Sequence, residues 1–346
     1  MTPATRFRVC LLIAAAAAAA IIAPRYIADP YGVFRAVDAP THKQVNLRIV
    51  KQDRLQAGCA GADSYVLGNS RATAYETAAL EDIYGGRFFN MNVPAETWRG
   101  IELRALWLID HCSPERLIVS LSPAAFRYGF FDESYSRVEP AMITGRPDWL
   151  IRADFLRVPM SAAFTNADSQ GQFLYEPATG HWRYPALEAR RASGEGFPGA
   201  SRCASPGERS YRPKRYAGQK RALARILKAA GSQDVELVFI VEPLSATILT
   251  RLGAEIYTGW LTDVAPQVPE LVFLGGFHDF TLDGVNYWDQ THFRPGPTTA
   301  LLNEALKHRN GAMVGAWSRP HYDRLTAMVA ANYAGHAYLC DGTGGS

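Results

Sequence analysis

The stretch YVLGNSRA, residues 65–72, decides how this chain folds. Its first three residues belong to a short apolar run of the kind that forms a buried strand, and Gly68 ends that run. The polar residues Asn69, Ser70 and Arg71 follow at once, where a strand of a parallel sheet would give way to a helix. We therefore predict a buried strand that delivers a serine to one edge of the sheet.

Predicted strands alternate with helical stretches along the rest of the chain. The strands are expected at Ser64–Gly68, Arg87–Val93, Arg116–Leu121, Val235–Val241 and Leu271–Leu274. The stretches between them have helical periodicity, and the clearest, KRALARILKAAG, ends at Gly231. Such alternation is typical of an α/β fold, in which a parallel sheet has helices on both faces.

The connection between the third and fourth predicted strands is much longer than the others. Residues 130–215 carry scattered aromatic residues and then RRASGEGFPGASRCASPGERSYRPKR, which has the pattern of neither a helix nor a strand. A long connection of this kind is usually a functional lid or a disordered segment, and its basic residues indicate a solvated loop face. We predict an insertion over about residues 130–215. It interrupts a domain at 27–310, and a C-terminal helix with a flexible tail follows at 311–346.

The N-terminus carries an apolar run behind two arginines. Val9–Ala23 reads VCLLIAAAAAAAIIA and follows Arg6 and Arg8. The run has the length of a secretory signal and is shorter than the roughly 20 residues that a spanning helix prefers. A cleaved signal and an uncleaved anchor both fit, whereas a core helix rarely opens a chain behind two arginines. We favour an anchor over residues 1–26, with the domain in the periplasm or at the cell exterior. Cleavage would instead give a secreted protein.

Composition and charge bound the class of protein. The chain has 346 residues, of which 48% are hydrophobic and 20% are charged. These values are ordinary for a globular protein with a full core, so they exclude disorder of the whole chain. The net charge of +3 is too weak to indicate nucleic acid as a partner.

Export would permit disulfides among the four cysteines that follow the apolar run. Four cysteines allow three connectivities. Cys59 and Cys112 each lie five residues before an apolar strand run, at Ser64 and at Leu117. If these two strands are parallel neighbours, both cysteines lie at the same edge of the sheet. We predict a Cys59–Cys112 disulfide and leave the remaining cysteines unassigned.

Ser70 is a candidate nucleophile because of its place at the end of a strand. Ligands of an open parallel sheet bind beyond the carboxyl ends of the strands, where the strand order reverses. A serine at that point exposes its hydroxyl, and its backbone N–H at the start of a helix suits an oxyanion. The competing interpretation is an ordinary helix N-cap.

The stretch NYWDQTHFRP, residues 286–295, offers the other groups that a serine nucleophile needs. Such a serine requires a base, and the base requires an orienting acceptor. Asp289 and His292 are three residues apart, so within one turn the carboxylate reaches one ring nitrogen while the other faces outward. Because this stretch follows the last predicted strand, it should lie at the same sheet edge as Ser70. The residues favour a Ser–His–Asp triad.

Three stretches together resemble the SGNH (GDSL-like) hydrolase superfamily: VLGNSRA, FFNMNVPAET and NYWDQTHFRPGPTTALL. More narrowly, they are similar to its membrane-anchored extracytoplasmic members, such as the alginate O-acetylation proteins and the D-alanyl transfer protein of teichoic acids. The resemblance covers roughly residues 27–308 in order. It implies a flavodoxin-like parallel five-stranded sheet of order 2-1-3-4-5, with Ser70 as nucleophile, His292 as base and Asp289 as its orienting partner.

The oxyanion hole implied by the resemblance is altered in this sequence. The family combines the nucleophile's own N–H with a glycine after the second strand and an asparagine after the third. The glycine position most nearly aligns with Ala95, where a left-handed conformation would be costly, and Ser122 follows the third strand. Either Asn90 or Asn92 is a substitute donor. The expected oxyanion or substrate-binding residues are therefore Asn69, Arg71, Asn90, Asn92, Ala95 and Ser122.

Arg71 has two interpretations. It holds an anionic or hydroxyl-rich substrate, or it ties the start of the helix to a carboxylate such as Asp63 or Asp289. We favour the second, since a guanidinium fork is well suited to fixing a carboxylate. His278 and Asp279 would complete a mixed metal site with Asp289 and His292, but such pairs are common at strand ends. We expect no metal and no cofactor.

The sequence as a whole predicts an exported serine-dependent acyl-ester hydrolase or O-acyltransferase. Its substrate would be a cell-envelope polysaccharide or glycoconjugate, and the acyl-enzyme would pass its acyl group to water or to a sugar hydroxyl. The expected partners are an acyl donor or envelope polysaccharide, the membrane through the N-terminal segment, and a membrane acyltransferase. The alternative is a non-catalytic binding or assembly component of such a modification system, which the altered oxyanion motif favours.

Overall fold

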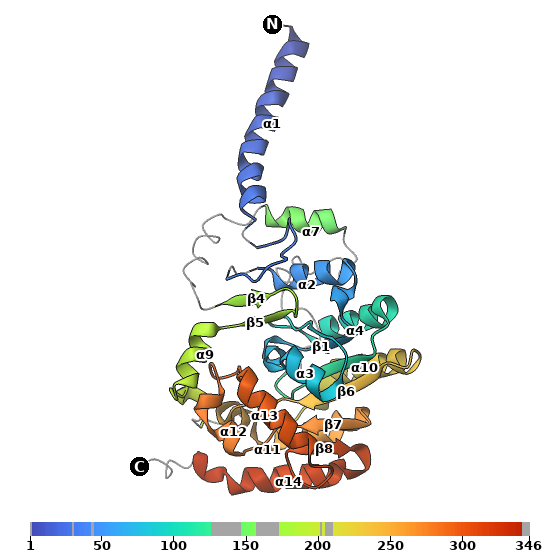
Figure 1. Cartoon of the computed structure of the whole chain (residues 1–346), viewed down its shortest axis with the longest axis vertical. Helices are drawn as coiled ribbons and strands as arrows, with labels where there is room; N and C mark the ends of the chain where they lie inside the picture. The colour runs from blue at the N-terminus through green and yellow to red at the C-terminus, as the bar shows by residue number, and fades with distance from the viewer. Residues whose placement is uncertain are drawn as a thin grey trace.

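The computed structural model describes residues 2–29, 31–42, 45–125, 147–156, 173–200, 203–204 and 210–340. A long N-terminal helix projects from a body in which a sheet lies among helices (Figure 1). The fold is α/β, as the alternation of strands and helices predicts.

A six-stranded sheet lies at the centre of the described chain, in the order β2-β1-β3-β6-β7-β8. Its strands are β1 (Ser64–Leu67), β2 (Phe88–Asn90), β3 (Arg116–Leu121), β6 (Glu236–Val241), β7 (Glu270–Phe273) and β8 (Gly315–Ser318). All the pairs are parallel except that of β7 with β8, which is antiparallel. The prediction of a mostly parallel sheet is confirmed. The predicted count of five strands is wrong, because β8 adds an antiparallel sixth strand to one edge.

The central strands are buried on both faces, which explains their continuous apolar sequences. Alternate side chains of a strand point to opposite faces of the sheet. Accordingly, Tyr65 and Leu67 of β1 pack in one core cluster, while Val66 packs in another on the opposite face. In register, Val66 lies opposite Ile118 of β3 and Asn90 of β2. The first strand is therefore held on both sides along its length.

Helices cover the two faces of the sheet. The larger core cluster packs α4 (Trp98–Cys112), α10 (Pro213–Gly231), α11 (Ala246–Asp263) and α14 (Tyr322–Gly335). The cluster on the other face packs α3 (Thr77–Tyr84) and α13 (Pro295–Leu306). The sequence predicts one continuous helix after Ser70. The chain instead forms the short 3-10 helix η2 (Ser70–Ala74) and then α3.

The predicted insertion at 130–215 contains regular structure where it is described. It holds α7 (Asp148–Phe155), the antiparallel strands β4 (Leu174–Glu176) and β5 (His181–Arg183), and α9 (Pro185–Ala192). The aromatic residues are the physical reason, because they form a small core of their own. Phe173, Tyr175 and Trp182 pack against Leu47 and Val50 of α2 (Leu47–Gln56). In the stretch at 190–215, which was expected to form neither a helix nor a strand, that expectation is wrong where α9 ends at Ala192, at the 3-10 helix η4 (Pro198–Ala200) and where α10 begins at Pro213. Residues 130–146, 157–172, 201–202 and 205–209 of the insertion lie outside the described residues.

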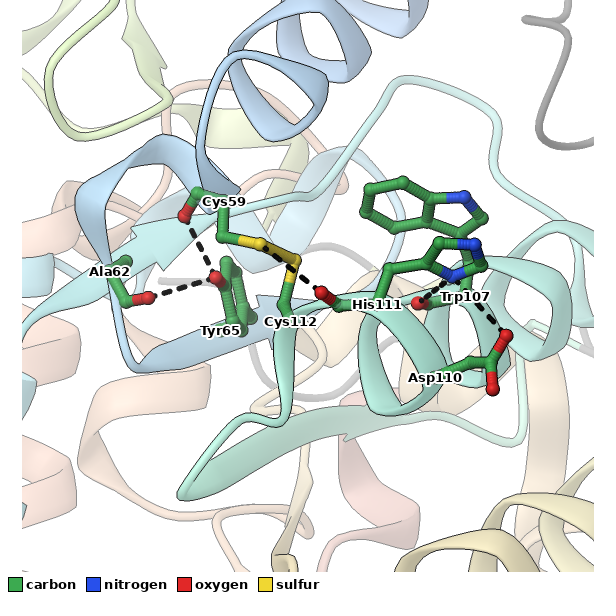
Figure 2. Close-up of a disulfide and its surroundings, with 7 residues drawn as sticks. All are labelled: Cys59, Ala62, Tyr65, Trp107, Asp110, His111 and Cys112. Carbon is green, nitrogen blue, oxygen red and sulfur yellow. Dashed lines mark hydrogen bonds and ion pairs between the residues drawn. A yellow bond between two sulfur atoms is a disulfide. The ribbon is translucent and has the colours of Figure 1, made fainter.

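Two disulfides link segments that are far apart in the sequence. Cys59 is bonded to Cys112, the pair expected from the sequence, with 5.7 Å between the Cα atoms (Figure 2). Beside this bond the Tyr65 hydroxyl donates to the Cys59 carbonyl at 2.8 Å and to the Ala62 carbonyl at 2.9 Å. This disulfide lies at the amino ends of β1 and β3, whereas Ser70 follows the carboxyl end of β1. The second disulfide joins Cys203 and Cys340.

The N-terminal helix α1 (Pro3–Ala28) is the described helix that is long and apolar enough to cross a membrane. Its 26 residues exceed the about 20 that spanning requires, and none of them is buried in the body. An apolar N-terminal helix of this kind serves as a membrane anchor or as an export signal. The two disulfides suggest an extracytoplasmic domain. At the other end, the segment at 311–346 contributes β8 and α14, while 341–346 lie outside the described residues.

Candidate active site

Ser70, His292 and Asp289 form one hydrogen-bonded chain. The Ser70 Oγ atom lies 2.8 Å from His292 Nε2, and His292 Nδ1 lies 2.7 Å from Asp289 Oδ2. Ser70 and His292 are 222 residues apart in the sequence, and the sheet brings them together at the carboxyl ends of its strands. The three side chains are thus connected in the order serine, histidine, aspartate that a catalytic triad requires.

The turn after β1 fixes the position of Ser70. Asn69 is the N-cap of η2, and its Oδ1 accepts the Arg71 amide at 2.9 Å, so Ser70 is the first residue of η2 and does not cap it. Gly68 allows the close approach of the turn to β3, because a Cβ there would lie 2.6 Å from the Ala72 Cβ and 2.9 Å from that of Ser120. The cap therefore comes from Asn69 and leaves the Ser70 hydroxyl to His292.

The loop that carries His292 is held by its own aspartate. Asp289 Oδ1 accepts the amides of Thr291 at 2.7 Å and of His292 at 2.9 Å, while Oδ2 faces the imidazole. Burial disfavours ionisation of Asp289, but the hydrogen bond and charge of His292 outweigh it and keep the pKa of this carboxyl below its usual range. An ionised Asp289 favours the tautomer with a proton on Nδ1, which leaves Nε2 to accept from Ser70.

Ala95 has the left-handed backbone that the sequence marks as costly. Its φ is +54° in the loop after β2. A left-handed conformation costs a non-glycine residue roughly 1–2 kcal/mol, and such strain is often found at functional sites. Within the described residues, neither the Ala95 amide nor the Ser70 amide donates to an acceptor of the chain. Both N–H groups therefore lack an acceptor among the described residues.

The loop that carries Ala95 runs beside the turn that carries Ser70. The amide of Met91 donates to the Val66 carbonyl at 2.8 Å, and the amide of Val93 donates to the Gly68 carbonyl at 3.4 Å. The Asn92 side-chain amide also donates to the Asn69 carbonyl at 3.3 Å. These bonds place the segment before Ala95 along the end of β1.

Asn90 and Asn92 brace this turn from within the core. Both side chains are fully buried. The side-chain NH2 group of Asn90 donates to the carbonyls of Ala72 at 2.9 Å and Tyr75 at 3.3 Å. Its side-chain Oδ1 accepts the backbone N–H of Asn92 at 3.0 Å. Both side-chain N–H groups of Asn90 are thus bonded to the backbone, whereas Asn92 Nδ2 makes one such bond, to the Asn69 carbonyl at 3.3 Å.

Buried charges of α2 and α4 hold the same loop, and the sequence analysis missed them. Lys51 Nζ donates to the carbonyls of Asn90 at 2.8 Å and Asn92 at 2.5 Å. Burial, and then the charge of Arg104, keeps the pKa of Lys51 well below its usual value. The only sequence signal was a lysine within the otherwise buried face of a helix.

Glu96 anchors the end of that loop between two arginines. Its Oε2 lies 2.8 Å from Arg104 Nε and 3.4 Å from Arg48 Nη1, while Arg48 Nη2 donates to the Pro94 carbonyl at 2.6 Å. Burial disfavours ionisation, but the charges of Arg104 and then Arg48 keep the pKa of Glu96 below its usual value. Ala95 thus lies between Pro94, whose carbonyl accepts from Arg48, and Glu96, which is held in buried ion pairs.

Arg71 pairs with a carboxylate, but not with either of the two named from the sequence. Its Nε lies 2.5 Å from Oε2 of Glu242, the residue directly after β6, and Ser120 Oγ donates to Glu242 Oε1 at 2.7 Å. Asp63 instead accepts from residues at the start of β1, and Asp289 binds His292. Expecting Asp63 or Asp289 was wrong because pairing of β3 with β6 brings Glu242 beside η2.

The remaining predicted residues lie outside this chain of contacts. The Ser122 hydroxyl accepts the Ala124 amide at 3.2 Å in a turn after β3, and no described hydrogen bond joins it to the triad. His278 Nε2 lies 3.0 Å from the Leu274 carbonyl oxygen, and burial lowers the pKa of this imidazole. Among the described residues no group of three or more His, Cys, Asp or Glu side chains is placed to hold a metal ion.

The β4–β5 hairpin of the insertion packs against the Ser70 segment. The Thr73 hydroxyl donates to the Trp182 carbonyl, and the Thr77 amide donates to His181 Nε2 at 3.0 Å. Burial, and then the charges of Lys51 and Arg183, lowers the pKa of His181 to about 3. The imidazole is therefore neutral, as an acceptor of an amide proton must be.

The helix α9 of the insertion binds the loop that carries His292. The Arg191 guanidinium donates to the carbonyls of Tyr287 at 3.0 Å and Trp288 at 3.1 Å. Glu188 accepts the Trp288 indole N–H at 2.7 Å and pairs with Arg294 at 2.6 Å. The insertion thus joins the two segments that carry the triad.

Tyr184 connects the hairpin to the triad loop. Its ring makes an edge contact with Trp288, with 5.5 Å between the ring centroids. Burial, and then the nearby charge of Asp289, raises the pKa of the Tyr184 phenol. A half-buried, protonated phenol therefore lies near the triad carboxylate.

No protein-family model matches this chain, and no curated protein matches it either. What the site can do therefore follows from its own geometry. A serine hydroxyl bonded to an imidazole, which is in turn bonded to an ionised carboxylate, is suited to nucleophilic attack on a carbonyl carbon.

Proposed function

We propose that this chain is an exported, membrane-anchored SGNH-like enzyme that transfers acyl groups by means of Ser70, His292 and Asp289. The observation that carries the proposal is the hydrogen-bonded chain from Ser70 Oγ through His292 to Asp289, with links of 2.8 and 2.7 Å. The order β2-β1-β3-β6-β7 of the parallel strands supports the likeness to that superfamily.

The first half-reaction forms an acyl-enzyme on Ser70. Its hydroxyl proton moves to His292 Nε2 as Oγ bonds to the carbonyl carbon of an ester. The resulting oxyanion accepts hydrogen bonds from the free backbone N–H groups of Ser70 and Ala95. The bond from the carbonyl carbon to the leaving alcohol then breaks, and His292 returns the proton to that alcohol.

The second half-reaction passes the acyl group to an acceptor. Water or a sugar hydroxyl gives its proton to His292 and attacks the acyl carbon. The bond to Ser70 Oγ breaks, and the serine regains its proton from His292. Asp289 remains ionised throughout and holds the imidazole in place, since the pKa of this carboxyl lies below its usual range.

The expected substrate is a cell-envelope polysaccharide or glycoconjugate, with a membrane acyltransferase as a possible source of acyl groups. The helix α1 and the two disulfides support this setting, because an anchored extracytoplasmic domain meets envelope glycans. A non-catalytic binding role is favoured by one observation. Both side-chain N–H groups of Asn90 are bonded to backbone carbonyls, so Asn90 adds no free side-chain donor to the oxyanion site.

Labelling with a fluorophosphonate tests the proposed nucleophile. The full chain, purified in detergent, should be labelled, and labelling should be lost in both Ser70→Ala and His292→Ala. Ser193→Ala is the matched control, because that serine is exposed on the insertion and its hydroxyl donates to the Arg190 carbonyl. An unlabelled wild-type protein with an intact thermal transition would contradict the nucleophile and favour a binding role.

A further inference from the structure

The helix α7 carries the large apolar side chains that the described body leaves exposed. Outside α1, the exposed large apolar residues of the described chain are Trp149, at 70% exposure, and Leu150, at 36%. They are neighbours on one short helix. Soluble domains bury most side chains of this size, so an exposed pair of this kind indicates an interaction surface.

The opposite face of α7 is firmly packed. Ile151 and Phe155 form a core cluster with Val33 and with Ile49 of α2. The Phe155 ring also contacts Tyr31, at 5.9 Å between centroids. The exposure of Trp149 is therefore a property of a fixed helix with two distinct faces.

Arg152 attaches α7 to the body with charged hydrogen bonds. Its guanidinium lies 2.6 Å from Asp148 on the same helix and 2.6 Å from Asp53 of α2, and it also donates to the Val33 carbonyl. These bonds hold the face with Trp149 in one orientation relative to α2 and Val33.

Asp29 and residues 31–35 link this surface to the end of α1. Asp29 ends the helix, and its carboxylate accepts the amides of Val33 at 2.8 Å, Phe34 at 3.1 Å and Arg35 at 3.0 Å. The ring of Tyr26 in the last turn of α1 contacts that of Phe34, at 5.4 Å between centroids. Figure 1 shows α7 lying next to the end of α1 from which the body begins.

We propose that α7 is a second membrane contact, with Trp149 and Leu150 inserted among the lipid headgroups beside the anchor. A spanning α1 would place the bilayer surface near its last turn, which is where α7 lies. Tryptophan favours the boundary between hydrocarbon and water, and a helix with one apolar face lies in that boundary. With two contacts instead of one, the domain keeps a fixed orientation over the membrane. The inference rests on the proposed anchoring and is independent of acyl transfer.

Quenching of tryptophan fluorescence by brominated lipid tests this contact. The full chain is reconstituted in phosphatidylcholine vesicles whose acyl chains are brominated near the headgroup. The other tryptophans, which lie at positions 98, 107, 182, 260, 288 and 317, are buried or half-buried, so lipid should quench Trp149 selectively. We expect clear quenching in the wild type, at least severalfold less in Trp149→Phe, and the wild-type response in the control Trp107→Phe.

Equal quenching in wild type and Trp149→Phe, with both chains bound to vesicles, would overturn the contact and favour a protein partner on this face. Recovery of the wild-type chain in the supernatant would overturn the anchor and the contact together. Neither result affects Ser70, because fluorophosphonate labelling of the same samples reports on the nucleophile separately.

Discussion

Arg71 donates through Nε to Glu242 Oε2 at 2.5 Å and so joins the residue next to Ser70 to the end of β6. Glu242 is almost fully buried, and its other oxygen accepts from Ser120 at the end of β3. One carboxylate therefore ties the turn that carries Ser70 to two strands of the sheet. We infer that it acts as a positioning residue for Ser70.

Replacing this carboxylate should destabilise the protein. Glu242→Gln leaves a buried guanidinium without a counter-charge, which typically costs roughly 3–5 kcal/mol in the free energy of unfolding. Urea denaturation measures that loss, and fluorophosphonate labelling should slow in parallel. Glu236→Gln is the matched control at the other end of β6. Its carboxylate pairs with Arg116 but is 53% exposed, so the change should cost about 1 kcal/mol or less. Equal effects of the two variants would contradict the positioning role.

Asp289→Asn should impair the nucleophile without removing it. The amide cannot stabilise a positively charged His292, and it permits the ring tautomer that leaves no acceptor for Ser70. Comparable changes in serine enzymes lower the rate by on the order of a thousandfold or more. The labelling rate with a fluorophosphonate measures the loss, and circular dichroism checks the fold. A rate near that of the wild type would show that Asp289 does not orient the base.

Ala95→Gly should relieve backbone strain. Glycine adopts φ near +54° without the roughly 1–2 kcal/mol cost of a side chain, which outweighs the about 0.4–1 kcal/mol of added freedom in the unfolded chain. We expect unchanged or slightly higher stability and retained labelling. Ala224→Gly, at an exposed position in the middle of α10, is the control and should lose about 1 kcal/mol. A similar loss in both variants would contradict the strained conformation of Ala95.

The free energy of unfolding should fall on mild acidification because of His181. Its pKa is about 3 in the folded protein, against about 6.5 for an ordinary histidine, so below pH 6.5 the unfolded chain binds the extra proton. The favourable contribution is complete above pH 6.5 and is lost as the pH falls toward 3, at about 1.4 kcal/mol per pH unit. Urea denaturation at several pH values measures the slope. It should be smaller in His181→Gln, whose amide oxygen is able to accept the Thr77 N–H, and an identical slope would refute the assignment.

The Cys59–Cys112 disulfide should affect stability more than the site. It closes a loop of 53 residues, for which the chain-entropy estimate is roughly 4 kcal/mol. The double variant Cys59→Ser/Cys112→Ser should therefore show a markedly lower thermal midpoint. Labelling of Ser70 at low temperature should persist, because the disulfide lies at the opposite edge of the sheet. Loss of labelling in a variant that is still folded would contradict this separation.

The parallel strands were predictable because each is a continuous apolar run that ends in a turn. β8 was not, since GAWS begins with glycine and ends with serine and so lacks a continuous apolar run, and it joins the sheet edge through antiparallel pairing with β7. The positions of Ser70 and His292 at one sheet edge followed from the strands that precede them. Their supports did not, because 171 residues separate Arg71 from Glu242 and only the folded sheet brings them together.

The loop after β2 shows, at a single residue, the same limit to what the sequence predicts. The sequence marks Ala95 as a place where a left-handed backbone would be costly, and the chain adopts that backbone nonetheless. Buried Lys51 and the ion pairs of Glu96 hold the loop on both sides, and these contacts come from helices that no local pattern connects to it. Tertiary contacts here determine the local conformation.

The most direct test of the account is the detection of an acyl group on Ser70. The full-length protein is incubated with p-nitrophenyl acetate, stopped with acid and examined by intact mass and peptide mapping. We predict the mass of one added acetyl group, located on the peptide that contains Ser70 and absent in Ser70→Ala and His292→Ala. Folded wild-type protein that gains no acetyl group and releases no p-nitrophenol above the Ser70→Ala background would contradict acyl transfer by this site.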